Sequence, residues 1–237
     1  MKDTHVLYLY LAFSSIAVVL ILLFVGSAPS PSPPIPFLEK LGIAGLFILC
    51  CILGISFTFR PNWIGGYFRR STNEEENEQP SVKRSFQGHH PACVPFQNHT
   101  IQWKKKTWCA GCFGLFIGLC IAILFMVLSM IYDVQPTRIL SYFLLLLGWV
   151  LLAMVYGETL IRSRYAIVHI VINSMLPVSF FSITIAVGAI TGKIIYGFFT
   201  ILLCVLWLDT RIHLSKWHHR LLCTHCPEPC KMFRETG

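Results

Sequence analysis

Six apolar runs, each long enough to cross a bilayer as a helix, constrain this chain more than any other feature. A helix needs roughly 20 apolar residues to cross the ~30 Å hydrocarbon core of a membrane. Hydrophobic residues make up 55% of the 237 residues and charged residues only 13%, which is too apolar for an ordinary soluble domain. We expect spans at about 6–25, 38–59, 113–132, 138–157, 165–190 and 193–213. The predicted fold class is an all-α integral membrane protein with about six transmembrane helices and small cytosolic Cys/His zinc-knuckle elements.

Two of these spans carry features that argue against a simple helix. Asn173 and Pro177 interrupt the fifth span, but membrane helices tolerate proline where neighbouring groups satisfy the freed carbonyl. We therefore expect a kink there and not a break. The first span occupies the position of a signal peptide, yet its apolar core is long and no clear small-residue cleavage motif precedes SAPSPSPPIP. We expect it to remain as a helix.

Lysine and arginine are distributed unevenly between the two sides of these spans. If the N-terminus is cytosolic, 16 of the 19 basic residues lie inside and only Lys40, Arg138 and Lys193 lie outside. The positive-inside rule then predicts a multi-pass protein of the cell membrane with both termini in the cytosol. The net charge of +8 indicates this topology and a surface that attracts anionic lipid headgroups, and no nucleic-acid partner is expected.

Composition divides the chain into five predicted segments. The run STNEEENEQP is too charged to pack, which predicts a linker. HTIQWKKKTW predicts a small hairpin, since His99, Ile101 and Trp103 alternate before the lysines. The last helix is expected to end near Cys223. The segments are a two-helix N-terminal transmembrane hairpin (1–59), a flexible cytosolic linker (60–85), a cytosolic Cys/His metal-binding knuckle (86–112), a four-helix transmembrane bundle (113–214) and a cytosolic Cys/His tail (215–237).

The first Cys/His cluster surrounds the motif CAGC, which runs directly into the third span. A CxxC turn lets two thiolates bind one ion, and a tetrahedral zinc site needs four such donors. Cytosolic thiols are kept reduced, which favours a metal over a disulfide. We expect zinc first; the plain alternative is that CxxC only starts a helix while the histidines face solvent. The candidate ligands are Cys109, Cys112, Cys93 and His99, with His89 and His90 as alternatives.

The second cluster has the spacing C-x2-C-x3-C at the end of the chain. Three thiolates and one histidine would close a second zinc site, while the same spacing resembles part of an iron–sulfur ligand run. The two clusters could also share one site, so the cofactor prediction is one or two zinc ions, with an iron–sulfur cluster as the minor alternative. The candidate ligands are Cys223, Cys226 and Cys230 with His219, His218 or His225.

The remaining cysteines have plainer interpretations. A redox interpretation treats Cys109 and Cys112 as a thioredoxin-like dithiol at a helix N-terminus, although the chain lacks the βαβ pattern that usually carries one. Cysteines without a spaced partner inside spans are predicted to be small packing residues. These are Cys50, Cys51, Cys120 and Cys204.

Several polar residues fall within or beside the fourth to sixth spans. Ionisable groups at bilayer depth are costly and usually paired, so the structural interpretation pairs Asp209 with an arginine, or Glu158 with Arg162 one turn later. The functional interpretation is a polar substrate or lipid-headgroup site, with His169 and Asn173 as its deepest part. The candidate residues are Glu158, Arg162, His169, Asn173, Asp209 and Arg211.

Several motifs together suggest a family. HHPAC, FQNHTI, CAGCFGLFIG, NSMLPVSFF and TRIHLSKWHHRLLC, within about 88–226, resemble uncharacterised archaeal membrane proteins related to the domain of unknown function 2085 family. That family carries a similar CxRCxG motif entering a transmembrane helix; this chain lacks the arginine, so no role of that arginine carries over. The resemblance implies an integral membrane protein without an established activity.

The function that follows best from the sequence is a scaffold or partner-docking membrane protein with structural zinc sites. One alternative is a membrane enzyme acting on a lipid or isoprenoid phosphate headgroup, in which arginines hold the phosphate. Another is a transporter or metal-handling protein, although no inverted repeat is evident. Whether the chain is an enzyme is left open.

Overall fold

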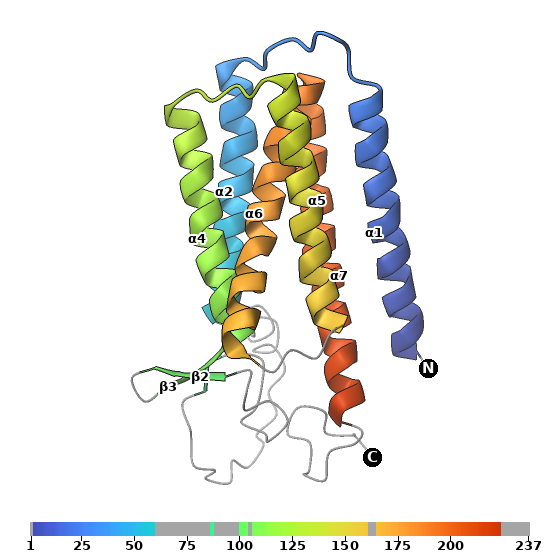
Figure 1. The fold of residues 1–237 in the computed structure, drawn as a ribbon, viewed down its shortest axis with the longest axis vertical. Helices are drawn as coiled ribbons and strands as arrows, with labels where there is room; N and C mark the ends of the chain where they lie inside the picture. Colours follow the sequence, from blue (N-terminus) through green and yellow to red (C-terminus); the bar gives the residue numbers. More distant parts are fainter. Residues whose placement is uncertain (1, 60–85, 88–99, 104–105, 161–164, 224–237) are drawn as a thin grey trace, which may run out of the picture.

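The computed structural model describes residues 2–59, 86–87, 100–103, 106–160 and 165–223, which form an up-and-down bundle of long helices with a small sheet at one end (Figure 1). The predicted linker at 60–85, most of the predicted knuckle and the end of the tail lie outside these residues. The elements are α1 (Lys2–Gly26), α2 (Phe37–Phe59), β1 (Phe86–Gln87), β2 (Thr100–Trp103), β3 (Lys106–Cys109), α4 (Ala110–Ile131), α5 (Arg138–Leu160), α6 (Ala166–Thr191) and α7 (Ile194–Cys223).

Six helices of the described chain are long and apolar enough to cross a membrane. Each span lies near the bounds expected from the sequence, and α7 continues beyond its span as one helix to Cys223. That end confirms the expectation for the last helix. α6 runs without a break through Pro177, in agreement with the expected continuity. The architecture is that of a helical, multi-pass membrane protein.

The helices are arranged around α6, which packs most extensively against α4 and α5 and also contacts α7. α1 lies at the edge of the bundle, mainly against α7 (Figure 1). The start of α1, the end of α7 and the β2–β3 strands share one end of the bundle, which we call the hairpin end. The opposite end, with the start of α2 and the end of α4, is the far end. Because the number of spans is even, the start of α1 and the end of α7 lie at the same end of the bundle.

The α4–α6 contact is a direct approach of two backbones. A Cβ atom added at Gly114 would overlap the carbonyl oxygen of Ile170, and one at Gly118 would overlap that of Ser174. This is the small-xxx-small arrangement by which membrane helices pack closely. The spacing GLFIG therefore fixes the position of α4 along α6, and Gly118 was not singled out by the sequence analysis.

The predicted hairpin is present at the N-terminus of α4. β2 pairs with β3 in antiparallel register, with Thr100 opposite Cys109 and Trp103 opposite Lys106. β1 adds a short parallel pair with β3, which the sequence did not predict. The hairpin leads directly into α4, because Cys109 both ends β3 and caps the helix.

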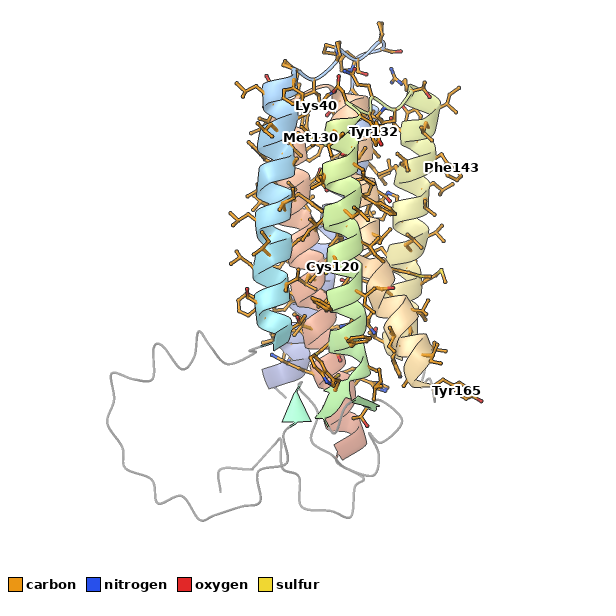
Figure 2. The ribbon with its side chains drawn as sticks, turned by 90° about the vertical axis from the view of Figure 1, so that its left-hand side faces the viewer. Lys40, Cys120, Met130, Tyr132, Phe143 and Tyr165 are labelled. Atoms are coloured by element: carbon orange, nitrogen blue, oxygen red, sulfur yellow. The ribbon has the colours of Figure 1, made fainter. Side chains whose placement is uncertain are left out.

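The far end is held by contacts between loops and helix ends. Lys40 donates a hydrogen bond of 2.6 Å to the Asp133 carboxylate, and this interaction lowers the pKa of that carboxyl below its usual value. Figure 2 shows Lys40 beside Met130 and Tyr132 at this end. Lys40 and Met130 also line a cavity of about 60 Å³ between α2, α4 and α6.

The isolated cysteines divide between the core and the surface. Cys51 and Cys204 are buried and Cys50 is half-buried, as expected for small packing residues. Cys120 is exposed on α4 (Figure 2). The packing interpretation is therefore wrong for Cys120, whose side chain lies outside the interior of the bundle.

The close contact at Gly118 predicts that two Gly→Ala substitutions differ in their effect on the stability of the protein. Gly118→Ala would force α4 and α6 apart and should lower the free energy of unfolding by about 2 kcal/mol, the usual cost of overpacking. Gly45→Ala is the matched control, because a Cβ there has no neighbour within 4 Å. Thermal unfolding in detergent measures both, and equal stability of the two variants would contradict the proposed contact.

Candidate functional site

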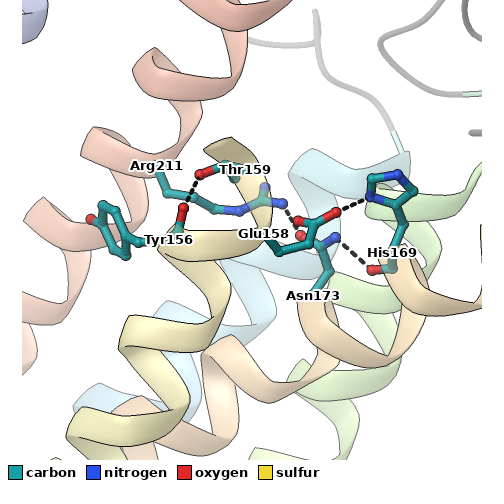
Figure 3. Close-up of polar contacts among 6 residues, drawn as sticks. All are labelled: Tyr156, Glu158, Thr159, His169, Asn173 and Arg211. Carbon is teal, nitrogen blue, oxygen red and sulfur yellow. Dashed lines mark hydrogen bonds and ion pairs between the residues drawn. The ribbon is translucent and has the colours of Figure 1, made fainter. Parts of the chain in front are cut away.

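Four polar side chains from three helices meet near the hairpin end (Figure 3). Glu158 lies in the last turn of α5, His169 and Asn173 lie one turn apart near the start of α6, and Arg211 lies on α7. His169 Nδ1 contacts Glu158 Oε1, and the Arg211 guanidinium donates to Asn173 Oδ1. Asn173 Nδ2 donates to the His169 carbonyl at 2.5 Å. We call these four residues the polar quartet.

The polar quartet is largely removed from solvent. Asn173 is 1% and Glu158 is 7% exposed, while the His169 side chain is 12% exposed. Charged groups lose their hydration at such depth, so each depends on its partners within the bundle. The quartet joins α5, α6 and α7 through polar contacts that would be costly to leave unmade.

The CxxC motif lies against this quartet. Cys109 caps α4 with extended backbone angles, φ −72° and ψ 124°, and is 4% exposed. A Cβ added at Gly111 would lie 3.7 Å from Asn173 Nδ2 and 3.9 Å from Cys109 Sγ. The Arg211 guanidinium is also within electrostatic range of Glu158, Cys112 and Cys109. The motif and the polar quartet therefore form one continuous site.

A second group of polar contacts, which the sequence analysis missed, joins α1, α5 and α7. The Tyr156 hydroxyl donates to the Trp207 carbonyl at 2.8 Å, and Trp207 Nε1 donates to the Ser14 carbonyl at 3.2 Å. The hydroxyls of Ser14 and Thr210 are 2.7 Å apart. A single hydroxyl residue in an apolar run usually bonds to its own helix, so Ser14 gave no sign of a contact between helices. The adjacent polar residues Thr210 and Arg211 were the sequence signal that this layer offered.

The structure brings four of the six predicted polar residues together and places Asp209 in other contacts. Asp209 lies 3.9 Å from His213 on the same helix, and His213 stacks on Tyr10 of α1 with ring centroids 4.2 Å apart. The expected pairing of Asp209 with an arginine is not among the contacts of the described residues. Arg162 lies outside them, so its expected pairing with Glu158 stays a prediction.

The described residues contain only part of the predicted metal clusters. Within them, no three Cys, His, Asp or Glu side chains converge in a way that could hold a metal ion. A zinc knuckle is thus not seen there, and zinc or an iron–sulfur cluster stays a prediction. Cys223 and His219 belong to the last turns of α7, with their side chains outside the description. The other ligand candidates, Cys93, His99, His89, His90, Cys226 and Cys230, lie outside the described residues entirely.

No protein-family model, no curated protein and no solved structure matches this chain. The family resemblance in the sequence stays a prediction, and any function has to be inferred from the residues of the site.

The contact between Glu158 and His169 predicts energetic coupling across α5 and α6. Glu158→Ala should lower the free energy of unfolding by about 3 kcal/mol, because it leaves buried polar partners unsatisfied. The double variant Glu158→Ala/His169→Ala should cost less than the sum of the two single variants. Denaturant titration of the purified protein measures this coupling.

Asp209→Ala provides the control for this cycle. The Asp209 side chain is 47% exposed, and exposed ion pairs contribute at most about 1 kcal/mol. Additive losses for Glu158 and His169, or an equal loss for Asp209, would contradict a coupled buried pair.

Proposed function

We propose that this membrane protein is a scaffold whose hairpin end carries a structural zinc site built on Cys109 and Cys112. The observation that supports the proposal best is the position of the CxxC turn. It connects a β-hairpin to a helix, and its glycine packs on the polar quartet of the bundle. A metal bound by this turn would tie the cytosolic loops to the membrane helices.

The local geometry suits a zinc knuckle. Cys112 lies three residues after the capping residue Cys109, so both thiols belong to the first turn of α4. Such a turn supplies two ligands of a tetrahedral site, and two more must come from elsewhere in the chain. His99 directly precedes Thr100, which lies opposite Cys109 in the hairpin. Cys93, His89 and His90 are the other candidates of the first cluster.

The second cluster belongs to the same proposal. α7 ends at Cys223 at the hairpin end of the bundle, and Cys226, Cys230 and a histidine such as His219 follow or precede it closely in sequence. We propose a second zinc site there, or ligands that complete the first site. Four protein ligands would make either site structural, since a catalytic zinc keeps one position open.

The contacts of the polar quartet favour a protein that binds a partner over an enzyme. Two pairs of its side chains contact each other, Glu158 with His169 and Arg211 with Asn173, and the cavity lined by Lys40 and Met130 lies at the far end. A folded, metal-stabilised hairpin end rich in basic residues would instead present a fixed surface. We propose that this surface binds a partner protein beside anionic lipid headgroups.

Zinc content tests the proposal directly. We expect one to two zinc ions per chain by elemental analysis of the wild-type protein, purified in detergent without a histidine tag. Cys109→Ser/Cys112→Ser should lose one ion and melt at a lower temperature, because the metal no longer links the loops to the bundle. Cys223→Ser/Cys226→Ser should lose the second ion if there are two sites, or the same ion if the site is shared.

Cys120→Ser is the matched control, because this thiol is exposed on the surface of α4. It should keep the full zinc content. Iron with visible absorbance would replace the zinc proposal with an iron–sulfur one. A wild-type protein without metal would reject both and leave the dithiol interpretation of Cys109 and Cys112.

The orientation in the membrane needs its own test. The distribution of basic residues leads us to propose that the hairpin end is cytosolic. An epitope inserted after Ser30, in the loop between α1 and α2, should then be stained in intact cells. An epitope at the C-terminus should be stained only after permeabilisation. The reverse pattern would overturn the cytosolic assignment and, with it, the reducing environment assumed for the cysteines.

A further inference from the structure

The Arg211 guanidinium has a buried donor that the bundle does not use. One of its terminal nitrogens bonds to Asn173, but its Nε has no hydrogen-bond partner among the described residues and is inaccessible to solvent. A buried N–H without an acceptor is costly, because it has lost its hydration and gained no bond. Such a donor calls for an explanation in the groups around it.

The neighbours of the guanidinium point to the CxxC turn. Arg211 is within electrostatic range of the Glu158 carboxylate, which also contacts His169, and of the sulfurs of Cys112 and Cys109. Its partner Asn173 packs on Gly111, the residue just before Cys112. The arginine on α7 is therefore held by α6 at the start of α4, beside the two thiols.

We infer that Arg211 donates its Nε–H group to a metal-bound cysteine sulfur of this turn, and so acts as a positioning residue for the proposed zinc site. This inference rests on the proposed function. Groups that hydrogen-bond to metal ligands orient those ligands and commonly change metal affinity by about 10–100-fold. A metal-bound thiolate carries negative charge, which a guanidinium in a low-dielectric site stabilises strongly.

Asn173 sets the orientation of the Arg211 guanidinium. Its Oδ1 accepts from Arg211 while its Nδ2 donates to the His169 carbonyl, so both ends of the amide are occupied. The amide holds the guanidinium in one orientation, with one side toward α6. The inferred bond from Nε–H to a sulfur would then make the polar quartet the support of the metal site.

Cobalt spectroscopy and zinc release test this inference together. Cobalt(II) replaces zinc in thiolate sites and gives sulfur-to-cobalt charge-transfer bands in the near ultraviolet. A hydrogen bond to the sulfur lowers the energy of its lone pairs, so its loss should move these bands to longer wavelength. Arg211→Lys keeps the charge but lacks the Nε–H group, and Arg211→Gln removes the charge. Both variants should show the shift and release zinc to a chelator roughly tenfold faster.

Tyr156→Phe is the control for general weakening of this region, because it removes the bond to the Trp207 carbonyl and leaves all four quartet side chains in place. It should leave the bands and the release rate unchanged. If wild-type protein binds no metal, the proposed function and this inference both fail. If wild-type protein shows thiolate bands that are the same in both Arg211 variants, the inference alone is overturned. Arg211→Lys decides the matter if Arg211→Gln does not fold.

Discussion

The close backbone contact between α4 and α6 is the constraint on which the site depends. Gly114 and Gly118 leave no side chain between the two helices, so van der Waals packing sets their register closely. Gly111 is one turn earlier on the same face and meets Asn173. The same stripe of glycines that packs the helices therefore delivers the CxxC turn to the polar quartet. A larger residue in the stripe would separate Cys109 and Cys112 from α6.

The polar quartet acts on the remaining helices. In hydrocarbon, helices gain little from apolar contact with one another, because lipid tails are equally apolar. Polar contacts between Glu158 and His169, and between Arg211 and Asn173, therefore select which faces of α5, α6 and α7 meet. The Ser14–Thr210 contact extends this selection to α1. Two adjoining polar layers thus define the bundle near its hairpin end, while the far end carries the partly exposed Lys40–Asp133 pair and bonds from Arg138 and Ser32 to backbone carbonyls.

Sequence reasoning recovered the parts of the fold that depend on local pattern. Apolar length predicted the six spans, and alternation before the lysines predicted the hairpin that ends at Cys109. It failed where contacts join helices that are distant in the chain. Helical spacing gave no sign that Glu158 contacts His169 on the next helix. The spacing of residues along one helix does not predict which face of α6 meets α5. For the same reason the sequence did not predict the bond that Tyr156 makes to α7.

The asymmetry between the two ends bears on what the protein does. Burying Arg211 and Glu158 costs hydration energy that a plain structural bundle could avoid with apolar residues. That cost is concentrated beneath the CxxC turn, where an arginine donor has no acceptor among the described residues. A group that supplied an acceptor at the hairpin end would offset part of that cost. The cost of burying charged groups thus lies at the hairpin end, beside the CxxC turn.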